Sequence, residues 1–244
     1  MIPVACEPPS QRDLPLSRHF ASSGHELLCA EGGTMSRRTV QRILGLYEGV
    51  WQGQRLGPRD HMVCADETPS IQARSRAVVP PAPGRPGLVE SDYQRRGALQ
   101  YLCAWDVRRG RPWGRCEAKT GIAAFTRLVD QVMARAPYRS ARRVSWIVDN
   151  GSAHRGERAV QRLQQRHPRC ILVHTPVHAS WLNQQEIYFG IVQRKGLTPA
   201  AAPDVTHLAT RIPALEARAR LTPAPFRWRF TRADFRRSLA QVAA

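Results

Sequence analysis

The sequence predicts an α/β protein built on one mixed sheet with helices packed over it. Three strand-like segments, at residues 61–67, 98–107 and 111–118, follow one another with no helical pattern between them. Beyond them, helical and strand patterns alternate as far as residue 197. Directly joined strands are typical of antiparallel pairs, whereas strands separated by helices are typical of parallel ones. A mixed sheet covered by helices accounts for both patterns.

The N-terminal part is predicted to start irregular and proline-rich and then to form two short helices. Residues 23–44 include an apolar helix, a glycine turn and a basic helix for which Ser36 is the expected N-cap. This order is that of a helix-turn-helix DNA reader, and a helical hairpin with a solvated basic face fits it equally well. The DNA-binding candidates on the second helix are Arg37, Arg38 and Arg42. We expect a shortened helix-turn-helix region at residues 1–47.

A connector at residues 48–60 is expected to lead into a catalytic domain at residues 61–197. Within it, residues 78–97 are too rich in proline and glycine to predict regular structure. The predicted elements that follow are a helix at 121–136, a strand at 144–150, a helix at 157–167, a strand at 170–176 and a helix that carries Glu186. Residues 198–244 are expected to close the chain with helices, but Pro199, Pro203 and Pro213 predict irregular structure over 198–221.

The charge of the chain favours a polyanionic partner. Lysine and arginine total 37 against 19 acidic residues, which gives a net charge of +18, and nearly all of the excess is arginine. Arginine suits bidentate phosphate contacts, so nucleic acid is the favoured partner, although arginine-rich codon usage also produces this composition. Arg74 and Arg76 are further candidates for contacting DNA.

Cysteine usage and the absence of targeting signals predict a cytoplasmic protein. The six cysteines form no CxxC pair and have no metal-type spacing, and Cys64, Cys103 and Cys170 lie in apolar runs that suit buried free thiols. The N-terminus lacks the charged and apolar regions of a signal peptide, and no apolar stretch is long enough to cross a bilayer.

Three acidic residues occupy positions from which they can meet in one cleft. Asp66 ends the strand MVCAD, Asp149 ends the strand VSWIVD, and Glu186 follows one strand later on a helix of otherwise apolar character. Ligand crevices form where central strands end, so these carboxylates are candidates for one site. Taken singly, an aspartate at a strand end is more often a turn former than a ligand.

Carboxylates gathered in one cleft repel one another unless a cation neutralises them. Oxygen ligands of this kind suit Mg²⁺ or Mn²⁺, and two such ions can activate an attacking oxygen and stabilise a leaving oxygen at phosphorus. Joined to the basic charge of the chain, this chemistry predicts a metal-dependent site for nucleic-acid phosphodiesters.

Three segments, CADETPSIQARSR, WIVDNGSAHRG and HTPVHASWLNQQEIYFGIVQRK, resemble the catalytic signatures of DDE transposases from bacterial insertion sequences of the mariner superfamily. PFRWRFTRADF is similar to the closing segment of that family. The resemblance implies a ribonuclease H-like fold in which Asp66, Asp149 and Glu186 hold two divalent metal ions. It also implies double-stranded DNA as substrate, first cut at the element ends and then joined to target DNA, and a homodimer as the active form in the bacterial nucleoid.

Supporting roles in this cleft are expected for Asn183 and His154, whereas Glu67 is expected to face the other side of its strand. The family usually carries a longer DNA-binding region, so this chain resembles a shortened copy. Two alternatives remain open: a nuclease that cuts without joining, and a DNA-binding relic that has lost its chemistry.

Overall fold

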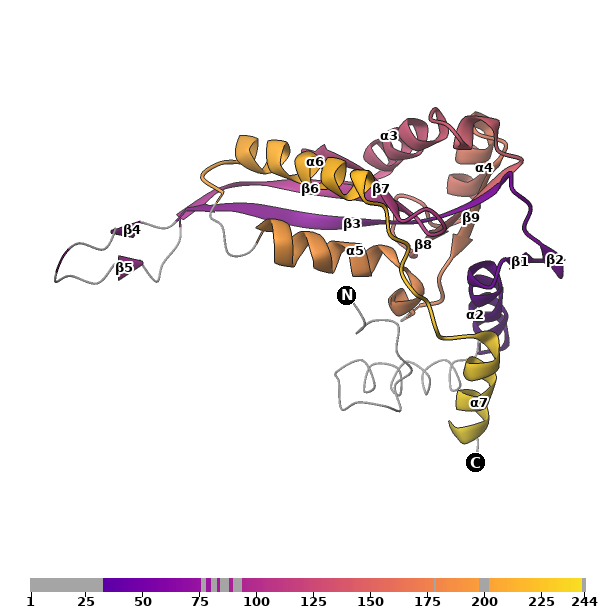
Figure 1. Cartoon of the computed structure of the whole chain (residues 1–244). Coiled ribbons are helices and arrows are strands. Elements are labelled where there is room, and N and C mark those ends of the chain that lie inside the picture. Colours follow the sequence, from indigo (N-terminus) through magenta and orange to yellow (C-terminus); the bar gives the residue numbers. More distant parts are fainter. Residues whose placement is uncertain are drawn as a thin grey trace.

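The computed structural model describes residues 33–75, 78–79, 83, 88–89, 94–177, 179–197 and 202–242. Its centre is a five-stranded mixed sheet in the order β7-β6-β3-β8-β9. Strand β3 pairs antiparallel with β6 and parallel with β8, and β8 pairs parallel with β9 (Figure 1). The strands are β3 (Asp60–Ser75), β6 (Gln94–Asp106), β7 (Arg111–Glu117), β8 (Arg143–Val148) and β9 (Cys170–His174). The predicted mixed sheet is confirmed.

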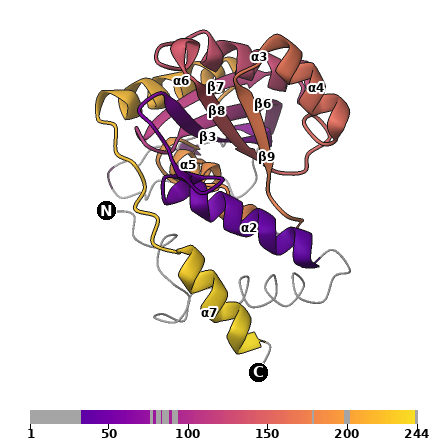
Figure 2. The same ribbon diagram turned by 90° about the vertical axis from the view of Figure 1, so that its right-hand side faces the viewer.

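Alternation along β3 gives the sheet two buried faces. Val63 and Ala65 point to one face, where they pack against α3 (Ile122–Met133) and α4 (Glu157–Arg166). Met62 and Cys64 point to the other face, because successive side chains of a strand alternate. This second face is covered by α5 (Gln185–Val192) and α6 (Val205–Leu221). The result is a sheet between two helical layers (Figures 1 and 2).

The N-terminal helix α2 (Gly33–Tyr47) belongs to the main core. Its residues Val40, Ile43, Leu44 and Leu46 have no exposed surface and join the same apolar cluster as α5 and α6. Helix α7 (Arg232–Val242) lies beside α2 and is tied to it by the Arg232–Glu48 ion pair at 2.6 Å (Figure 2). A helix is found where the basic helix was expected, but it begins at Gly33, so the expectation that Ser36 is its N-cap was wrong. The expected first helix lies outside the described residues, and the helix-turn-helix stays a prediction.

Short strands mark the two connecting regions. The hairpin of β1 (Val50–Trp51) and β2 (Gln54–Arg55) follows α2 directly. A second pair, β4 (Val78–Val79) and β5 (Leu88–Val89), lies in the proline- and glycine-rich segment for which the sequence predicted no regular structure. It extends away from the main sheet (Figure 1). That prediction was therefore wrong at these four residues, since backbone pairing tolerates the flanking prolines.

The expectation of irregular structure over residues 198–221 was wrong for residues 205–221, which form α6, while residues 198–201 lie outside the described residues. Helix α6 begins after Asp204, whose carboxylate accepts a hydrogen bond at 2.7 Å from the backbone N–H of His207. Of the three prolines, Pro203 precedes the helix and Pro199 lies outside the described residues, so only Pro213 interrupts it. Burial of Leu208 and Ile212 against the sheet outweighs the one helical hydrogen bond lost at Pro213.

The predicted burial of three cysteines is confirmed, because Cys64, Cys103 and Cys170 are buried free thiols. Within the described ranges, none of the helices has the length and apolar character needed to cross a membrane.

Candidate functional site

Asp66 lies in the middle of the central strand β3, opposite Cys103 of β6, so the prediction that it ends its strand was wrong. Only the pairing of β3 with β8 stops before it, at Cys64. Because it shares the alternation of Met62 and Cys64, its side chain faces the layer that contains α5. One carboxylate oxygen accepts a hydrogen bond from the backbone N–H of Glu67 at 2.8 Å. Burial raises the pKa of Asp66 to about 8, and the charges of Asp149 and Glu186 contribute to the rise. Asp66 is thus a mostly buried acid within electrostatic range of the other two.

Asp149 comes directly after β8, in a tight turn that its own side chain organises. Its Oδ1 accepts a hydrogen bond from the backbone N–H of Gly151 at 2.9 Å and lies 2.5 Å from Nε2 of His154. The His154 hydrogen bond is the main reason that the pKa of Asp149 is lowered. A side chain at position 151 would crowd this arrangement, because a Cβ there would lie 3.0 Å from Asp149 Oδ1.

Glu186 lies in the first turn of α5, and its side chain is exposed at the rim of the site. Partial burial and the charge of Asp149 raise its pKa. Its helix is anchored by Tyr188 and Val192, which are buried against the sheet, and Trp105 of β6 stacks on Tyr188 at 5.3 Å. The apolar neighbours of Glu186 in the sequence therefore hold the helix, while the acid points away from the core.

Asn183 links α5 to Asp66. The side chain is 1% exposed, and its Nδ2 donates to the backbone carbonyl of Ala65 at 3.1 Å and to Asp66 Oδ2 at 3.0 Å. Its Oδ1 accepts from the backbone N–H of Gln185 at 3.1 Å, which satisfies a free donor at the start of α5. One amide thus fixes both an acid and the helix that carries another acid.

His154 supports Asp149 from the opposite helical layer. The imidazole is buried against Phe125 at 4.8 Å, and its Nδ1 has no hydrogen-bond partner among the described residues. The backbone carbonyl of His154 lies 2.7 Å from His174 Nε2 at the end of β9. Glu67 follows the alternation of Val63 and Ala65, so its side chain is expected on this side of the sheet too. Burial raises the pKa of Glu67, and the charge of His154 lowers it.

Asn150 is a supporting residue that the sequence reasoning missed. Its Nδ2 donates to the backbone carbonyl of Thr175 at 2.6 Å, so the turn after β8 is fixed to the segment after β9. The available signal was its position between Asp149 and Gly151, since asparagine in a strand-end turn commonly bonds backbone groups.

The three carboxylates suit a hard divalent cation by chemistry, since all their donor atoms are oxygens. The electrostatics of the site also favour a cation, because repulsion from Asp149 and Glu186 contributes to the raised pKa of Asp66. Among the described residues, however, no three His, Cys, Asp or Glu side chains stand close enough to hold one ion. One oxygen of Asp149, Oδ1, is engaged by His154 and Gly151, and Glu186 lies exposed at the rim of the site.

The predicted DNA-binding arginines do not form one cluster in the described part of the chain. Arg38 and Arg42 are exposed on α2, and the Arg42 guanidinium lies 5.9 Å from the ring centre of Trp51. Arg37 is half-buried. Arg74 is exposed near the far end of β3, and Arg76 lies outside the described residues.

Comparison with known proteins places these features in a family. Residues 61–209 match the model of the DDE superfamily endonuclease family. A solved pre-cleavage Mos1 transpososome is 14% identical with a TM-score of 0.57, and the match covers 87% of this chain and 63% of that one. The Mos1 mariner paired-end complex with Mg is 14% identical with a TM-score of 0.55 over 85% and 61% of the two chains. A search of curated proteins finds no match.

The likeness to the Mos1 structures confirms the expected ribonuclease H-like fold, a mixed five-stranded sheet flanked by helices. This chain spans about 60% of the length of those solved chains. The family match covers well over half of the chain and contains Asp66, Asp149 and Glu186. The chain therefore belongs to the DDE superfamily endonuclease family.

Proposed function

We propose that this protein is a transposase that cuts DNA strands and transfers them, and that Asp66, Asp149 and Glu186 are its catalytic acids. The observation that carries the proposal is geometric: Asn183, next to the helix that carries Glu186, donates a hydrogen bond to Asp66 at 3.0 Å. The charges of Asp149 and Glu186, which contribute to the raised pKa of Asp66, support it. Family membership supports DNA phosphodiesters as the substrate class.

Each acid has a separate task in this proposal. Asp66, buried and bonded to Asn183, is the rigid member of the set. Asp149 is kept ionised by His154 and Gly151, so it offers a carboxylate at neutral pH. Glu186 completes the set from the exposed side, where a DNA strand can approach.

We further propose that these three residues hold divalent cations, Mg²⁺ or Mn²⁺, with two ions per site. Solved Mos1 paired-end complexes contain Mn and Mg, which supports this choice. When bound, such ions would neutralise the acids, activate an attacking oxygen and stabilise a leaving oxygen at phosphorus. Asn183 and His154 would then position Asp66 and Asp149 toward the ions.

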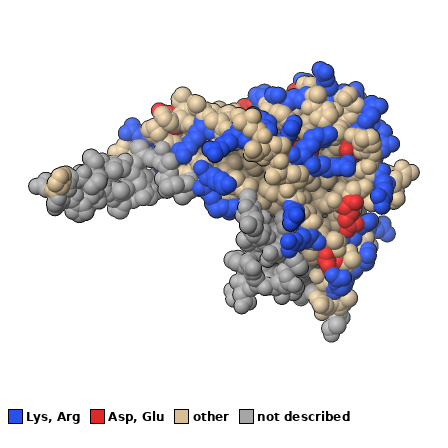
Figure 3. Space-filling model, viewed as in Figure 1, with Lys and Arg blue, Asp and Glu red and all other residues tan. Residues whose placement is uncertain are grey.

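The surface of the chain supports a DNA partner. Figure 3 shows lysine and arginine side chains spread over the sheet and its covering helices, while the acidic side chains on this face are few. Because the net charge is +18, we expect affinity for DNA to fall steeply with salt as phosphate contacts release counterions. Similar affinity at ~50 and ~200 mM salt would contradict this electrostatic contribution.

The decisive experiment uses a plasmid that carries the DNA flanking the gene, incubated with Mg²⁺ or Mn²⁺. Wild type is compared with Asp149→Asn, which keeps the shape of the side chain, and with Glu157→Gln, which removes an exposed acid at the start of α4 that accepts a hydrogen bond from Gln161. We expect cuts at the borders of the element with wild type and Glu157→Gln, no cuts with Asp149→Asn, and equal DNA binding by all three.

The products distinguish the alternatives. Joined products in target DNA support a transposase, whereas cuts without joining indicate a nuclease. DNA binding without metal-dependent cuts in any variant would leave a binding protein that has lost its chemistry. The paired-end state of the Mos1 complexes supports a homodimer as the active form, which the mass of the protein–DNA complex would test.

A further inference from the structure

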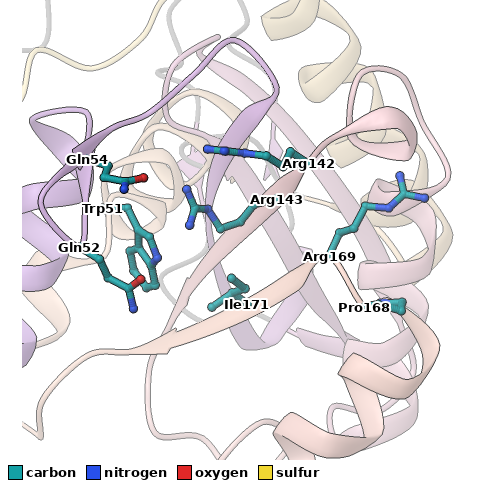
Figure 4. A pocket seen from close by; sticks show the side chains of 8 residues that line it. All are labelled: Trp51, Gln52, Gln54, Arg142, Arg143, Pro168, Arg169 and Ile171. Atoms are coloured by element: carbon teal, nitrogen blue, oxygen red, sulfur yellow. The ribbon is translucent and has the colours of Figure 1, made fainter.

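A basic cavity lies at the opposite end of the central strands from the acids. It has a volume of about 340 Å³ and opens between the β1–β2 hairpin and the starts of β8 and β9 (Figure 4). Trp51, Gln52 and Gln54 of the hairpin form one wall. Arg142, Arg143 and Arg169 supply the positive charge. The volume is within the range of small-ligand sites in proteins.

The cavity is separate from the carboxylate site. In the register of β3 and β8, Asp60 pairs with Arg143 at the start of both strands, whereas Asp66 lies six residues further along β3. At about 3.3 Å per residue, this places the two sites about 20 Å apart. Arginines at this end of the sheet therefore cannot touch a group that is held by Asp66.

The charge of the cavity is only partly neutralised within the chain. Asp60 is buried beneath it and accepts a hydrogen bond from Arg142 Nε at 3.0 Å, and Arg143 lies 3.5 Å from the same carboxylate. Arg169 uses Nη1 to bind the backbone carbonyls of Arg139 and Ala141. No acidic residue lines the cavity itself, so three guanidinium groups share one carboxylate and a net charge of about +2 remains.

Arg143 is the best-placed residue for a ligand. Its side chain is 19% exposed, and its guanidinium lies 5.4 Å from the ring centre of Trp51, which fixes its orientation (Figure 4). Its Nε is buried and has no hydrogen-bond partner among the described residues. A buried donor without a partner calls for an acceptor supplied from outside, such as an anionic oxygen.

The contacts of Trp51 indicate which class of ligand the cavity can bind. Arg42 and Arg143 both place guanidinium groups against its ring, and the residue is 8% exposed, so little of the ring is left for a stacked base. What the cavity offers instead is a set of N–H donors: three arginines and the exposed amides of Gln52 and Gln54. Such donors match the oxygens of a phosphate group.

We infer that this cavity is a second phosphate-binding site, which takes a backbone phosphodiester of double-stranded DNA. The choice of DNA over a free phosphate rests on the proposed function and on the exposure of Arg142 and Arg169, which leaves the cavity open to a long polymer. The site adds a DNA contact about 20 Å from the cleavage centre, and this contact reads no base sequence.

The test places one negative charge in the cavity and the same charge outside it. Gln54→Glu changes an exposed lining residue, and Gln165→Glu makes the same change on the exposed side of α4. A second matched pair is Arg169→Ala in the cavity and Arg158→Ala on α4. Binding of a fluorescent DNA duplex is measured by anisotropy over a range of salt concentrations, in EDTA, and circular dichroism checks the fold of each variant.

If the inference is right, Gln54→Glu and Arg169→Ala weaken binding more than their controls and lower the slope of log affinity against log salt by about 0.9. That slope change equals about a 3.5-fold smaller loss of affinity between ~50 and ~200 mM salt. Equal slopes within each pair, with the fold intact, would overturn it. Because EDTA prevents cleavage, these results do not depend on whether Asp66, Asp149 and Glu186 are catalytic.

A calorimetric titration with inorganic phosphate separates the two sources of the ligand. Weak or absent binding of inorganic phosphate, together with the DNA effects above, supports a backbone contact. Binding of inorganic phosphate that Gln54→Glu abolishes, with DNA affinity unchanged in both pairs, would overturn the assignment to DNA.

Discussion

Replacement of Asn183 by alanine tests the connection between the buried acid and the helix that carries its exposed partner. The amide makes three hydrogen bonds, to the carbonyl of Ala65 at 3.1 Å, to Asp66 at 3.0 Å and from the N–H of Gln185 at 3.1 Å. Two of these bonds are buried and the bond to Asp66 is partly buried, and each contributes about 1 kcal/mol net. We therefore expect Asn183→Ala to lower the free energy of unfolding by about 3 kcal/mol.

Asn183→Asp gives a sharper version of the same test. Aspartate keeps an oxygen for the Gln185 N–H, but it loses the two donors and places a carboxylate about 3 Å from Asp66. Above pH 8, where Asp66 is ionised despite its raised pKa, we expect this repulsion to destabilise the chain at least as much as alanine does. Added Mg²⁺ should recover part of the loss if the acids bind the ion, because a cation offsets the repulsion.

Equilibrium unfolding in urea, followed by circular dichroism in EDTA, measures both variants. Ser180→Ala is the control, because Ser180 lies three residues earlier and is exposed, so its change should stay within about 0.5 kcal/mol. A loss of less than about 1 kcal/mol for Asn183→Ala would refute the reasoning, since it would mean that the three bonds are not made in solution.

Three other substitutions test the fold around the site, each by urea unfolding. Pro213→Ala should raise the free energy of unfolding by about 1–3 kcal/mol, because Pro213 is exposed within α6 and alanine restores one helical hydrogen bond. An unchanged free energy of unfolding would mean that α6 accommodates the proline without destabilisation. Glu216→Ala should lower the free energy of unfolding by about 3 kcal/mol, because Glu216 accepts hydrogen bonds from Tyr101 OH at 3.0 Å, Gly114 N–H at 3.0 Å and Arg220 at 2.8 Å. A loss similar to that of the exposed Glu157→Ala would argue against this network. The Arg142 hydrogen bond lowers the pKa of Asp60, so this acid stabilises the fold above the ordinary carboxyl pKa, and the stabilisation is lost as the pH falls through the lowered pKa. Asp60→Asn should therefore destabilise the chain more at pH ~7 than at pH ~3. Equal losses at both pH values would contradict the ion pair.

The sequence by itself was sufficient for the order and type of most elements. The strands around Asp66 and Asp149 and the helix at 122–133 have short-range patterns of two and 3.6 residues, and such patterns follow from local geometry. The mixed sheet followed from the order of these elements, because directly joined strands pair antiparallel and strands separated by helices pair parallel. The same reliance on local patterns overestimated how strongly Pro213 disfavours a helix, because α6 is stabilised by burial of neighbouring residues, which is a long-range effect.

The candidate site was predictable as a set of residues and not as an arrangement. Asp66, Asp149 and Glu186 could be selected because the two aspartates were expected at strand ends and the glutamate stood among apolar residues, and the family resemblance reinforced that choice. The strand end expected at Asp66 does not exist, because β3 continues to Ser75. Their alignment on one side of the sheet depends on the register of β3 with β8 and on the docking of α5, which no local pattern encodes.

Contacts between distant segments were decided by the tertiary structure alone. Asn183 reaches Asp66 across 117 residues, and Arg142 reaches Asp60 across 82. The cavity at Trp51 joins a hairpin near the N-terminus to the starts of two later strands. Sequence patterns report what each residue prefers within a few neighbours, whereas these contacts depend on which surfaces meet once the sheet has formed, and that is fixed by packing of the whole chain.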